Sequence, residues 1–361
     1  MDERRQDLPI KGRGAVGNPT GRFERHTRHA VYDGWNLADE EPPRPRTVVG
    51  EDRSRTVLTR NDSPDISFDR SINPYRGCEH GCIYCFARPS HAWLGLSPGM
   101  DFETRLFAKS DAPTLLEKEL RRPGYRVRPV MLGSNTDAYQ PIERERRITR
   151  GILEVLAAFR HPVVIVTKSE MVTRDLDILE PMARDRLAAV GVSVTTLDPG
   201  LARRMEPRAT APRRRLKAIR KLAAVGIPTA VLVAPIIPAL TDTESEQILK
   251  AAVGAGASSA SYVMLRLPHE LKDLFTEWLH NHVPDRAERV LNRLRDCRDG
   301  QLYVSEFGNR MRGTGPYADL IARRFSLACR RLGLEETRAH HFQFDETKFC
   351  PPDSQRQLNL F

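Results

Sequence analysis

Three of the chain's six cysteines fall within eight consecutive positions, at Cys78, Cys82 and Cys85. Their spacing is C-x3-C-x2-C, and Gly77 and Gly81 allow the backbone there to curl. Thiols this close can converge on one centre with little loss of chain entropy. In a chain with so few cysteines, clustered thiols are more often metal ligands than disulfide partners. The segment therefore predicts a metal site.

The number of thiols bears on which metal this is. A structural zinc needs four ligands, usually as two separated pairs, and the nearby candidates for a fourth are His80 and His91. A four-iron cluster has four corners, so three cysteines leave one iron free for a cofactor or substrate. The remaining cysteines lie singly and far downstream, at Cys297, Cys329 and Cys350. They provide no second pair, which favours the iron cluster over zinc.

From residue 130 onward, short and wholly apolar runs alternate with segments of helical period. Such runs are typical of strands buried on both faces of a parallel sheet, and the alternation predicts repeated βα units. Six strands are predicted, one of them before the cysteines: 66–72, 130–132, 163–167, 187–195, 229–234 and 261–265. Six units are too few for an eight-stranded barrel, so a doubly wound sheet or a partial barrel is expected. In both, ligands bind at the carboxyl ends of the strands.

Prolines, glycines and apolar periods predict helices between and after these strands. One helix is expected from Pro212 to just before Gly226, and another over about 143–159, ending before Pro162. After residue 267 the period is helical again, over 269–281, 285–298 and 317–331. Residues 1–64 show no sustained apolar period. We therefore expect a mostly disordered N-terminal arm at 1–64, a βα body at 65–267 and a helical C-terminal extension at 268–361.

The composition excludes several classes of protein. With 40% hydrophobic and 29% charged residues over 361 positions, the chain is not a disordered one. The charged start, MDERRQDLPI, lacks the apolar core of a secretory signal. The longest apolar stretch, 226–240, is broken by three prolines and is shorter than the roughly 20 residues of a membrane span. We expect a cytoplasmic protein with no membrane partner.

The cysteine motif, in a loop after the first strand of a six-unit βα fold, resembles the radical SAM superfamily. In that family three thiolates hold a [4Fe-4S] cluster whose open iron binds S-adenosyl-L-methionine (SAM), and one-electron reduction yields a 5′-deoxyadenosyl radical that abstracts hydrogen from the substrate. The resemblance implies an α/β fold with a partial (β/α)6 TIM-like barrel. It also implies both cofactors, and a reductant such as flavodoxin or ferredoxin as a partner.

Further segments are similar to the spore photoproduct lyase branch, and especially to its uncharacterised bacterial relatives. Residues 61–91 look like those relatives nearly throughout. The lyases share shorter features at strand ends: Ser134 to Asp137, Thr167-Lys168, Ser193 with Glu206-Pro207, and Val233 to Ile236. The resemblance to the lyases covers about 61–267, and the C-terminal part matches only the uncharacterised relatives.

This resemblance implies that SAM is contacted by Tyr84, Ser134, Thr136, Lys168 and Ser193. Tyr84 would lie beside the adenine. At the methionine end an ammonium can pair with the carboxylate, and hydroxyls can accept from the amino group. Each hydroxyl could instead satisfy a buried strand or turn group, and Tyr84 could be a core aromatic packed beside the cluster.

One departure from the lyases concerns hydrogen donation. Those enzymes carry a donor cysteine in the turn after the second strand, whereas residues 133–137 here contain none. Repair of thymine photoproducts by the same radical-return step is therefore in doubt, unless Cys329, Cys350 or Tyr139 takes the donor's place. The alternative for each is a packed or bystander residue.

The net charge of +10 favours anionic partners, and the basic residues are clustered. Segment 201–221 holds nine Arg or Lys, and further groups are Arg121, Arg122, Arg126 and Arg128, and Arg310 with Arg312. They could contact phosphates or be merely solvated helix surface. Three hypotheses follow: a radical SAM enzyme acting on nucleic acid, one modifying a protein or small molecule, and a non-enzymatic zinc-stabilised binding protein.

Overall fold

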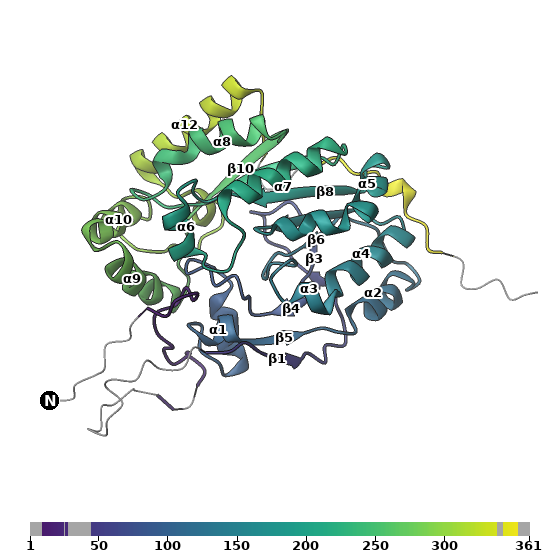
Figure 1. The fold of residues 1–361 in the computed structure, drawn as a ribbon, viewed down its shortest axis with the longest axis horizontal. Coiled ribbons are helices and arrows are strands. Elements are labelled where there is room, and N and C mark those ends of the chain that lie inside the picture. Colours follow the sequence, from purple (N-terminus) through teal and green to yellow (C-terminus); the bar gives the residue numbers. More distant parts are fainter. Residues whose placement is uncertain (1–8, 25, 28–44, 338–341, 353–361) are drawn as a thin grey trace, which may run out of the picture.

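The computed structural model describes residues 9–24, 26–27, 45–337 and 342–352, and is built on an eight-stranded sheet (Figure 1). Its central strands are parallel: β3 (Arg70–Ile72), β6 (Val130–Leu132), β7 (Val163–Thr167), β8 (Ala188–Ser193), β9 (Thr229–Ile236) and β10 (Ser259–Met264). At one edge β2 (Thr59–Arg60) pairs antiparallel with β3, and at the other β11 (Glu335–Glu336) pairs parallel with β10. The predicted strands therefore exist, although the first is confined to the end of its predicted range.

The strand order distinguishes the two predicted architectures. The six parallel strands lie side by side in the order in which they occur along the chain. A doubly wound sheet reverses its order at a switch point, whereas a (β/α) barrel does not. Since the sheet still has two edges, the barrel is open. The prediction of an α/β fold with a partial (β/α)6 barrel is confirmed.

Helices connect the strands, and α4 and α7 lie in front of the sheet in Figure 1. The helices of the body are α1 (Asp101–Thr104), α2 (Ala112–Leu120), α3 (Glu143–Arg146), α4 (Ile148–Ala158), α5 (Leu176–Arg184), α6 (Pro199–Met205), α7 (Pro212–Ala224) and α8 (Ser245–Gly254). The C-terminal helices are α9 (Leu271–His282), α10 (Pro284–Asp296), α11 (Asn309–Arg312) and α12 (Gly315–Leu332). The helix predicted over 143–159 is two helices, because Arg147 between them adopts a left-handed backbone with φ 51°.

Two apolar clusters hold these layers together. The larger lies between the sheet and its helices, where Ile152 and Leu156 of α4 and Leu222 of α7 are fully buried. The spacing of these residues gives each helix an apolar stripe that faces the core. The second cluster joins the cysteine segment to α9 and α10 and contains the fully buried Trp278. The C-terminal helices thus support the segment that carries the predicted metal ligands.

Part of the N-terminal segment packs onto the body. In its described parts, 9–24, 26–27 and 45–64, Ala15, Val16 and Val57 are buried, and β1 (Val48–Glu51) pairs with β5 (Arg105–Ala108). A further strand, β4 (Tyr75–Arg76), completes this three-stranded sheet. The mostly disordered arm at 1–64 stays a prediction as a whole. The described residues within it are held by hydrogen bonds to distant side chains and by strand pairing, neither of which produces an apolar period in the sequence. Residues 1–8, 25 and 28–44 lie outside the described part.

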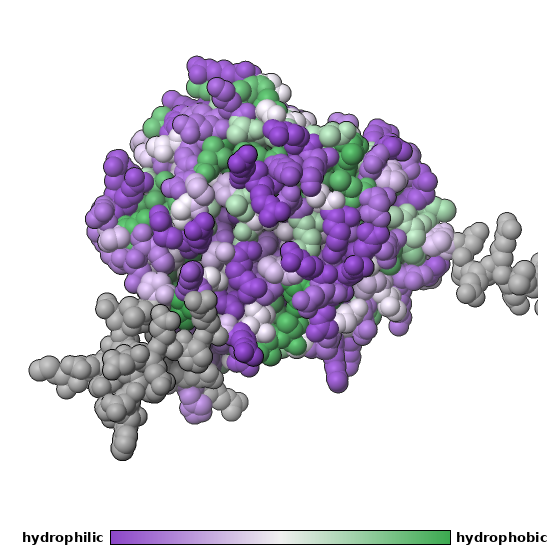
Figure 2. All heavy atoms as spheres, viewed as in Figure 1, coloured by the Kyte–Doolittle hydropathy of each residue, from purple (hydrophilic) through white to green (hydrophobic). Residues whose placement is uncertain are grey.

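The surface is predominantly polar. Hydrophilic side chains cover most of the face in Figure 2, and apolar ones occur there in small separate groups. Large apolar side chains that remain exposed include Phe86 and Trp93. Among the described helices, none is long and apolar enough to cross a membrane.

His161, between α4 and β7, predicts a loss of stability in mild acid. The imidazole is fully buried, and its Nε2 lies 2.9 Å from the Tyr125 hydroxyl. Burial lowers the pKa of His161 from 6.5 to about 4. The unfolded chain therefore takes up this proton first as the pH falls. The stability associated with neutral His161 is complete above pH 6.5 and is lost between pH 6.5 and about 4, by up to roughly 3 kcal/mol.

Urea unfolding at about pH 7 and about pH 5 measures this effect. A His161→Gln variant cannot titrate at this position, so its unfolding free energy should fall less between the two pH values than that of the wild type. Equal falls in the two proteins would contradict the assignment to His161.

Candidate metal and cofactor site

The three cysteines lie in a loop that follows β3 and β4. Cys78 and Cys82 are buried and Cys85 is partly exposed. The loop turns tightly: the Gly81 amide donates to the Cys78 carbonyl at 3.3 Å, and the Cys85 amide donates to the Cys82 carbonyl at 3.2 Å. Gly81 has a φ of 66°, and a Cβ there would lie 2.6 Å from a carboxylate oxygen of Glu103. Glycine is therefore required at this turn.

The thiols are close enough to influence one another. Burial raises the pKa of Cys78, and Asp137 and the other two cysteines raise it further. Within the described ranges, no three His, Cys, Asp or Glu side chains are already gathered as metal ligands. Three soft thiolate donors in a glycine-containing loop fit an iron–sulfur cluster.

A buried ion pair fixes the inner side of this loop. Arg88 begins the 3-10 helix η1 (Arg88–Leu94) and pairs with Glu103, and neither side chain is exposed. The Arg88 guanidinium also donates to the carbonyls of Gly81 at 3.0 Å and Cys82 at 2.9 Å. Two carbonyls of the cysteine loop thereby find buried donors. The pair therefore fixes the backbone of the loop at the second cysteine.

The N-terminal segment closes over the same loop. The Glu103 carboxylate accepts hydrogen bonds from the amides of Gly14 at 2.9 Å and Ala15 at 2.8 Å. Ala15 packs in the same apolar cluster as Cys82. The approach is so close that a Cβ on Gly14 would lie 1.8 Å from the carbonyl oxygen of Gly81. We call residues 13–16 the N-terminal clasp.

We expect the substitution Gly14→Ala to open the clasp. The added methyl group cannot be accommodated against a backbone carbonyl, so the segment must withdraw and expose Cys82. In the metal-free protein, alkylation of Cys82 by iodoacetamide, followed by peptide mass spectrometry, should become roughly tenfold faster because local opening costs less free energy. Lys11→Ala, at an exposed position of the same segment, should leave the rate unchanged. A rate for Gly14→Ala equal to that of the wild type would contradict the clasp.

The loop after β6 supports the cysteine loop from the other side. Asp137 accepts hydrogen bonds from the Thr167 hydroxyl at 2.6 Å and the Lys168 amide at 2.7 Å, and lies 3.3 Å from His80. Burial alone would raise the pKa of Asp137, but His80 and these hydrogen bonds hold it well below its ordinary value. Asp137 thus connects the cysteine loop to the end of β7, the strand that carries Lys168.

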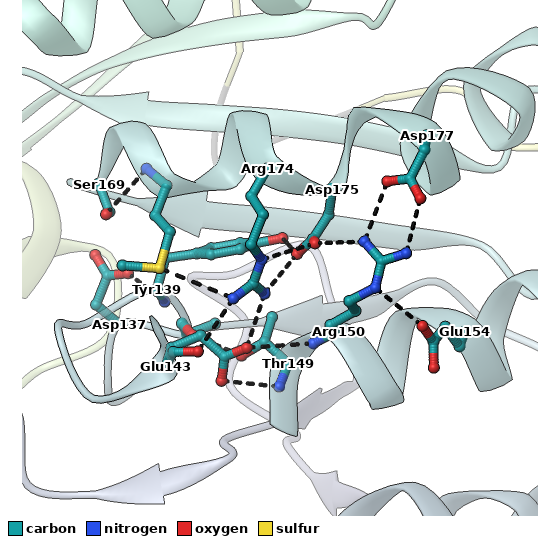
Figure 3. Close-up of polar contacts among 12 residues, drawn as sticks. Asp137, Tyr139, Glu143, Thr149, Arg150, Glu154, Ser169, Arg174, Asp175 and Asp177 are labelled. Atoms are coloured by element: carbon teal, nitrogen blue, oxygen red, sulfur yellow. Dashed lines mark hydrogen bonds and ion pairs between the residues drawn. The ribbon is translucent and has the colours of Figure 1, made fainter. Parts of the chain in front are cut away.

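A buried polar network anchors this supporting loop (Figure 3). The Asp175 carboxylate accepts from Tyr139 at 3.0 Å and pairs with Arg174 and Arg150. Glu143 pairs with Arg174 in turn. Both carboxylates are fully buried, and each is satisfied by several donors, as buried charges require. The network therefore fixes the positions of the loops after β6 and β7.

Tyr84 and Lys168 lie together beside the cysteines. Lys168 Nζ is 5.6 Å from the centre of the Tyr84 ring, and its charge opposes the raising effect of burial on the pKa of Cys82. The Tyr84 hydroxyl donates to Glu206 and lies 3.1 Å from the Thr195 hydroxyl. Lys168 has no carboxylate partner among the described residues. Lys168 is half-buried, and an anionic ligand would give its ammonium the partner that buried lysines usually have.

Two of the three hydroxyls predicted to contact SAM already have partners in the protein. Thr136 donates to the Tyr75 carbonyl at 3.1 Å, and Ser134 lies 3.1 Å from the side-chain nitrogen of Asn73. This favours the alternative that they satisfy turn groups, although their oxygens can still accept. Ser193 is buried at the end of β8. SAM contacts by these three hydroxyls therefore stay predictions.

Arg215 is one of the nine basic residues of 201–221, and no role of its own was predicted for it. The side chain is 1% exposed and pairs with the buried Glu206, which also accepts from Thr195 at 2.8 Å. It donates further to the Thr210 carbonyl at 2.6 Å. The signal was present in the sequence, because Arg215 lies three and seven residues before the buried Ala218 and Leu222, on the apolar stripe of α7.

The predicted basic patches are partly neutralised. Several of their members have carboxylate partners: Arg214 and Lys221 with Glu170, Arg208 with Glu79, Arg121 with Glu117, Arg128 with Glu346, Arg310 with Asp65 and Arg312 with Glu336. A paired arginine contributes less to the external field than an unpaired one. The patches therefore give weaker support for phosphate binding than their sequence indicates.

The proposed substitutes for the lyase donor lie in unsuitable places. The Cys350 amide donates to the Phe159 carbonyl at 3.0 Å, and the Leu334 amide donates to the Cys329 carbonyl at 2.9 Å. These contacts place both cysteines near the amino ends of the strands, whereas the cysteine loop follows the carboxyl end of β3. Tyr139 is fully buried and bound to Asp175. The two cysteines therefore lie at the opposite edge of the sheet from the cysteine loop, and the Tyr139 hydroxyl is occupied by Asp175.

Comparison with known proteins places this geometry in context. Residues 72–252 match the family model of the radical SAM superfamily. An uncharacterised protein of Mycobacterium tuberculosis is 38% identical over 226 residues, which cover 62% of this chain and 66% of that protein. An uncharacterised protein of Methanocaldococcus jannaschii is 30% identical over 174 residues, covering 48% and 62%. The chain therefore spans just under two thirds of the length of these relatives.

Among solved structures, spore photoproduct lyase complexed with dinucleoside spore photoproduct superimposes with a TM-score of 0.56 at 17% identity. The match covers 80% of this chain and 81% of that chain. A variant of the same lyase with bound AdoMet and dinucleoside spore photoproduct gives the same score. Likeness at this identity concerns the fold alone.

Proposed function

Because this chain belongs to the radical SAM superfamily, we propose that it is an enzyme in which Cys78, Cys82 and Cys85 hold a [4Fe-4S] cluster and Lys168 and Tyr84 bind SAM. The observation that carries the proposal is the position of Lys168, whose ammonium lies beside Tyr84 and the cysteines without a carboxylate partner in the described residues. The cluster and SAM, when bound, supply the one-electron chemistry that generates a 5′-deoxyadenosyl radical.

The chain's own residues have separate tasks in this proposal. Lys168 pairs with the carboxylate of SAM, a charge-assisted contact that fixes the methionine end. Tyr84 is held by Glu206 and Thr195, so its ring stays in place beside the cofactor. The N-terminal clasp and the Arg88–Glu103 pair cover the cysteine loop and exclude water from it. Exclusion of water protects a reactive radical from side reactions.

For the substrate we propose nucleic acid. The net charge of +10 favours a polyanion, and the structurally similar lyase is one complexed with a dinucleoside spore photoproduct. The lyase donor cysteine has no counterpart in residues 133–137. We therefore propose that hydrogen is abstracted from a nucleic-acid substrate and that the resulting substrate radical is not reduced by a cysteine in that turn.

Anaerobic reconstitution tests the proposal. The wild-type protein should bind about four iron and four sulfide per chain and, after reduction with dithionite, convert SAM to 5′-deoxyadenosine. An anaerobically prepared sample that contains zinc, without iron or sulfide, would contradict the proposal and favour a zinc-stabilised binding protein.

A further inference from the structure

Two arginines at the end of β10 have no carboxylate partner among the described residues. Arg298 is 1% exposed, and its guanidinium donates to the carbonyls of Leu265 at 2.9 Å and Asn309 at 2.8 Å. Its Nε is buried and has no hydrogen-bond partner. Burial and the neighbouring charge of Arg266 lower the pKa of Arg298. A buried guanidinium without a counter-charge is costly, so an anion next to it would be stabilising.

Arg266 is the second of these arginines. Its Nε is also buried without a partner, and a terminal nitrogen lies 3.6 Å from the Met311 sulfur. The guanidinium lies 5.0 Å from the centre of the Phe86 ring. Phe86 directly follows Cys85, and its side chain is 43% exposed. Two close positive charges therefore adjoin an exposed aromatic ring immediately beside the predicted cluster.

Arg266 and Phe86 lie where a substrate would be expected to bind. Arg266 follows the carboxyl end of β10, and Phe86 lies in the loop after the carboxyl end of β3. The carboxyl ends of parallel strands meet at the same edge of the sheet, where barrels of this kind bind their ligands. A substrate held here would reach the mouth of the barrel beside the cluster.

We propose that Arg266 and Phe86 form a nucleotide-binding subsite, in which the Arg266 guanidinium binds a backbone phosphate, Phe86 stacks on the adjoining base, and the buried Arg298 adds positive charge behind them. The proposal rests on the proposed function, whose substrate it specifies. Guanidiniums match phosphate oxygens bidentately, and exposed aromatic rings beside basic residues are the usual platform for single-stranded nucleic acid. An acidic peptide would satisfy the arginines but would leave the exposed ring without a role.

Fluorescence anisotropy tests the subsite in the reconstituted full-length protein under anaerobic conditions. The probe is a short fluorescein-labelled single-stranded oligothymidylate. We expect Arg266→Gln and Phe86→Ala each to raise Kd roughly tenfold. For Arg266→Gln, the slope of log Kd against the logarithm of the salt concentration should also fall by about 0.7, the value for one lost phosphate contact on a single strand. Arg298 is left unchanged, since its replacement would remove donors from two buried carbonyls.

Matched controls use the same side-chain changes elsewhere. Arg122→Gln removes an exposed arginine of a predicted basic patch, and Trp93→Ala removes another exposed aromatic side chain. Both should leave Kd within about twofold of the wild type. Equal weakening by Arg122→Gln and Arg266→Gln would overturn the subsite, because binding would then be diffuse. Binding of polyglutamate in place of the oligonucleotide would overturn its assignment to nucleotides.

Failure of this proposal is distinguishable from failure of the proposed function. If the wild type forms 5′-deoxyadenosine but does not bind the oligonucleotide, the subsite is wrong and the radical chemistry stands. If the oligonucleotide binds with the expected dependence on Arg266 and Phe86 but SAM is never cleaved, the subsite stands and the proposed function is wrong.

Discussion

Reconstituted Cys82→Ala protein is expected to form no 5′-deoxyadenosine above background under conditions in which the wild type does. The cluster needs all three thiolates, because a fourth corner must remain open for SAM and the chain has no spare cysteine in this loop. The charge of Lys168 opposes the raising effect of burial on the pKa of Cys82, so Cys82 lies near the proposed SAM-binding lysine. The variant should also lack the broad visible absorption of an iron–sulfur cluster.

The matched control is Cys350→Ala, which removes an exposed cysteine near the amino ends of the strands. It should retain both the cluster and the formation of 5′-deoxyadenosine. Equal product from Cys82→Ala and the wild type would rule out the proposed ligand set. Loss of product in both variants would indicate damage to the protein from altered thiol content rather than loss of a ligand.

Much of the fold could be predicted because buried parallel strands have a direct signature in sequence. Their wholly apolar runs, such as 163–167, coincide with strands of the structure. The break at Arg147 could not be predicted, because a left-handed arginine has no compositional signal. The contacts of the N-terminal segment could not be predicted for another reason: its amides bind the carboxylate of Glu103, almost ninety residues away.

The parts of the site that lie close together in the sequence could be predicted. The parts that depend on which side chains pair in the folded protein could not. The cysteine motif needs no tertiary information. Tertiary information is needed to tell whether an arginine has a carboxylate partner. Arg310 is paired with Asp65 from a distant segment, whereas Arg266 has no such partner in the described residues. Counting basic residues in the sequence therefore predicted patches whose arginines are partly paired. The arginines without a carboxylate partner could be identified only from the structure.

The substitution Glu103→Ala is expected to lower the free energy of unfolding by about 3–5 kcal/mol. Glu103 is fully buried and pairs with the equally buried Arg88. Its removal leaves the Arg88 charge without a counter-charge in a place that water does not reach. It also removes the acceptor of the Gly14 and Ala15 amides, so the N-terminal clasp loses its attachment to the cysteine loop. Urea unfolding of the metal-free protein measures the loss as a lower midpoint.

Glu117→Ala is the control that separates burial from charge. Glu117 pairs with Arg121 one helical turn away, but its side chain is 46% exposed, so its removal should cost less than about 1 kcal/mol. Both variants delete one carboxylate and one ion pair with an arginine. If they lost equal stability, the cost would come from the change in net charge and not from a buried ion pair. A large difference would instead assign the lost stability to the buried pair of Glu103 with Arg88. In the wild type this pair joins the cysteine loop to the N-terminal segment.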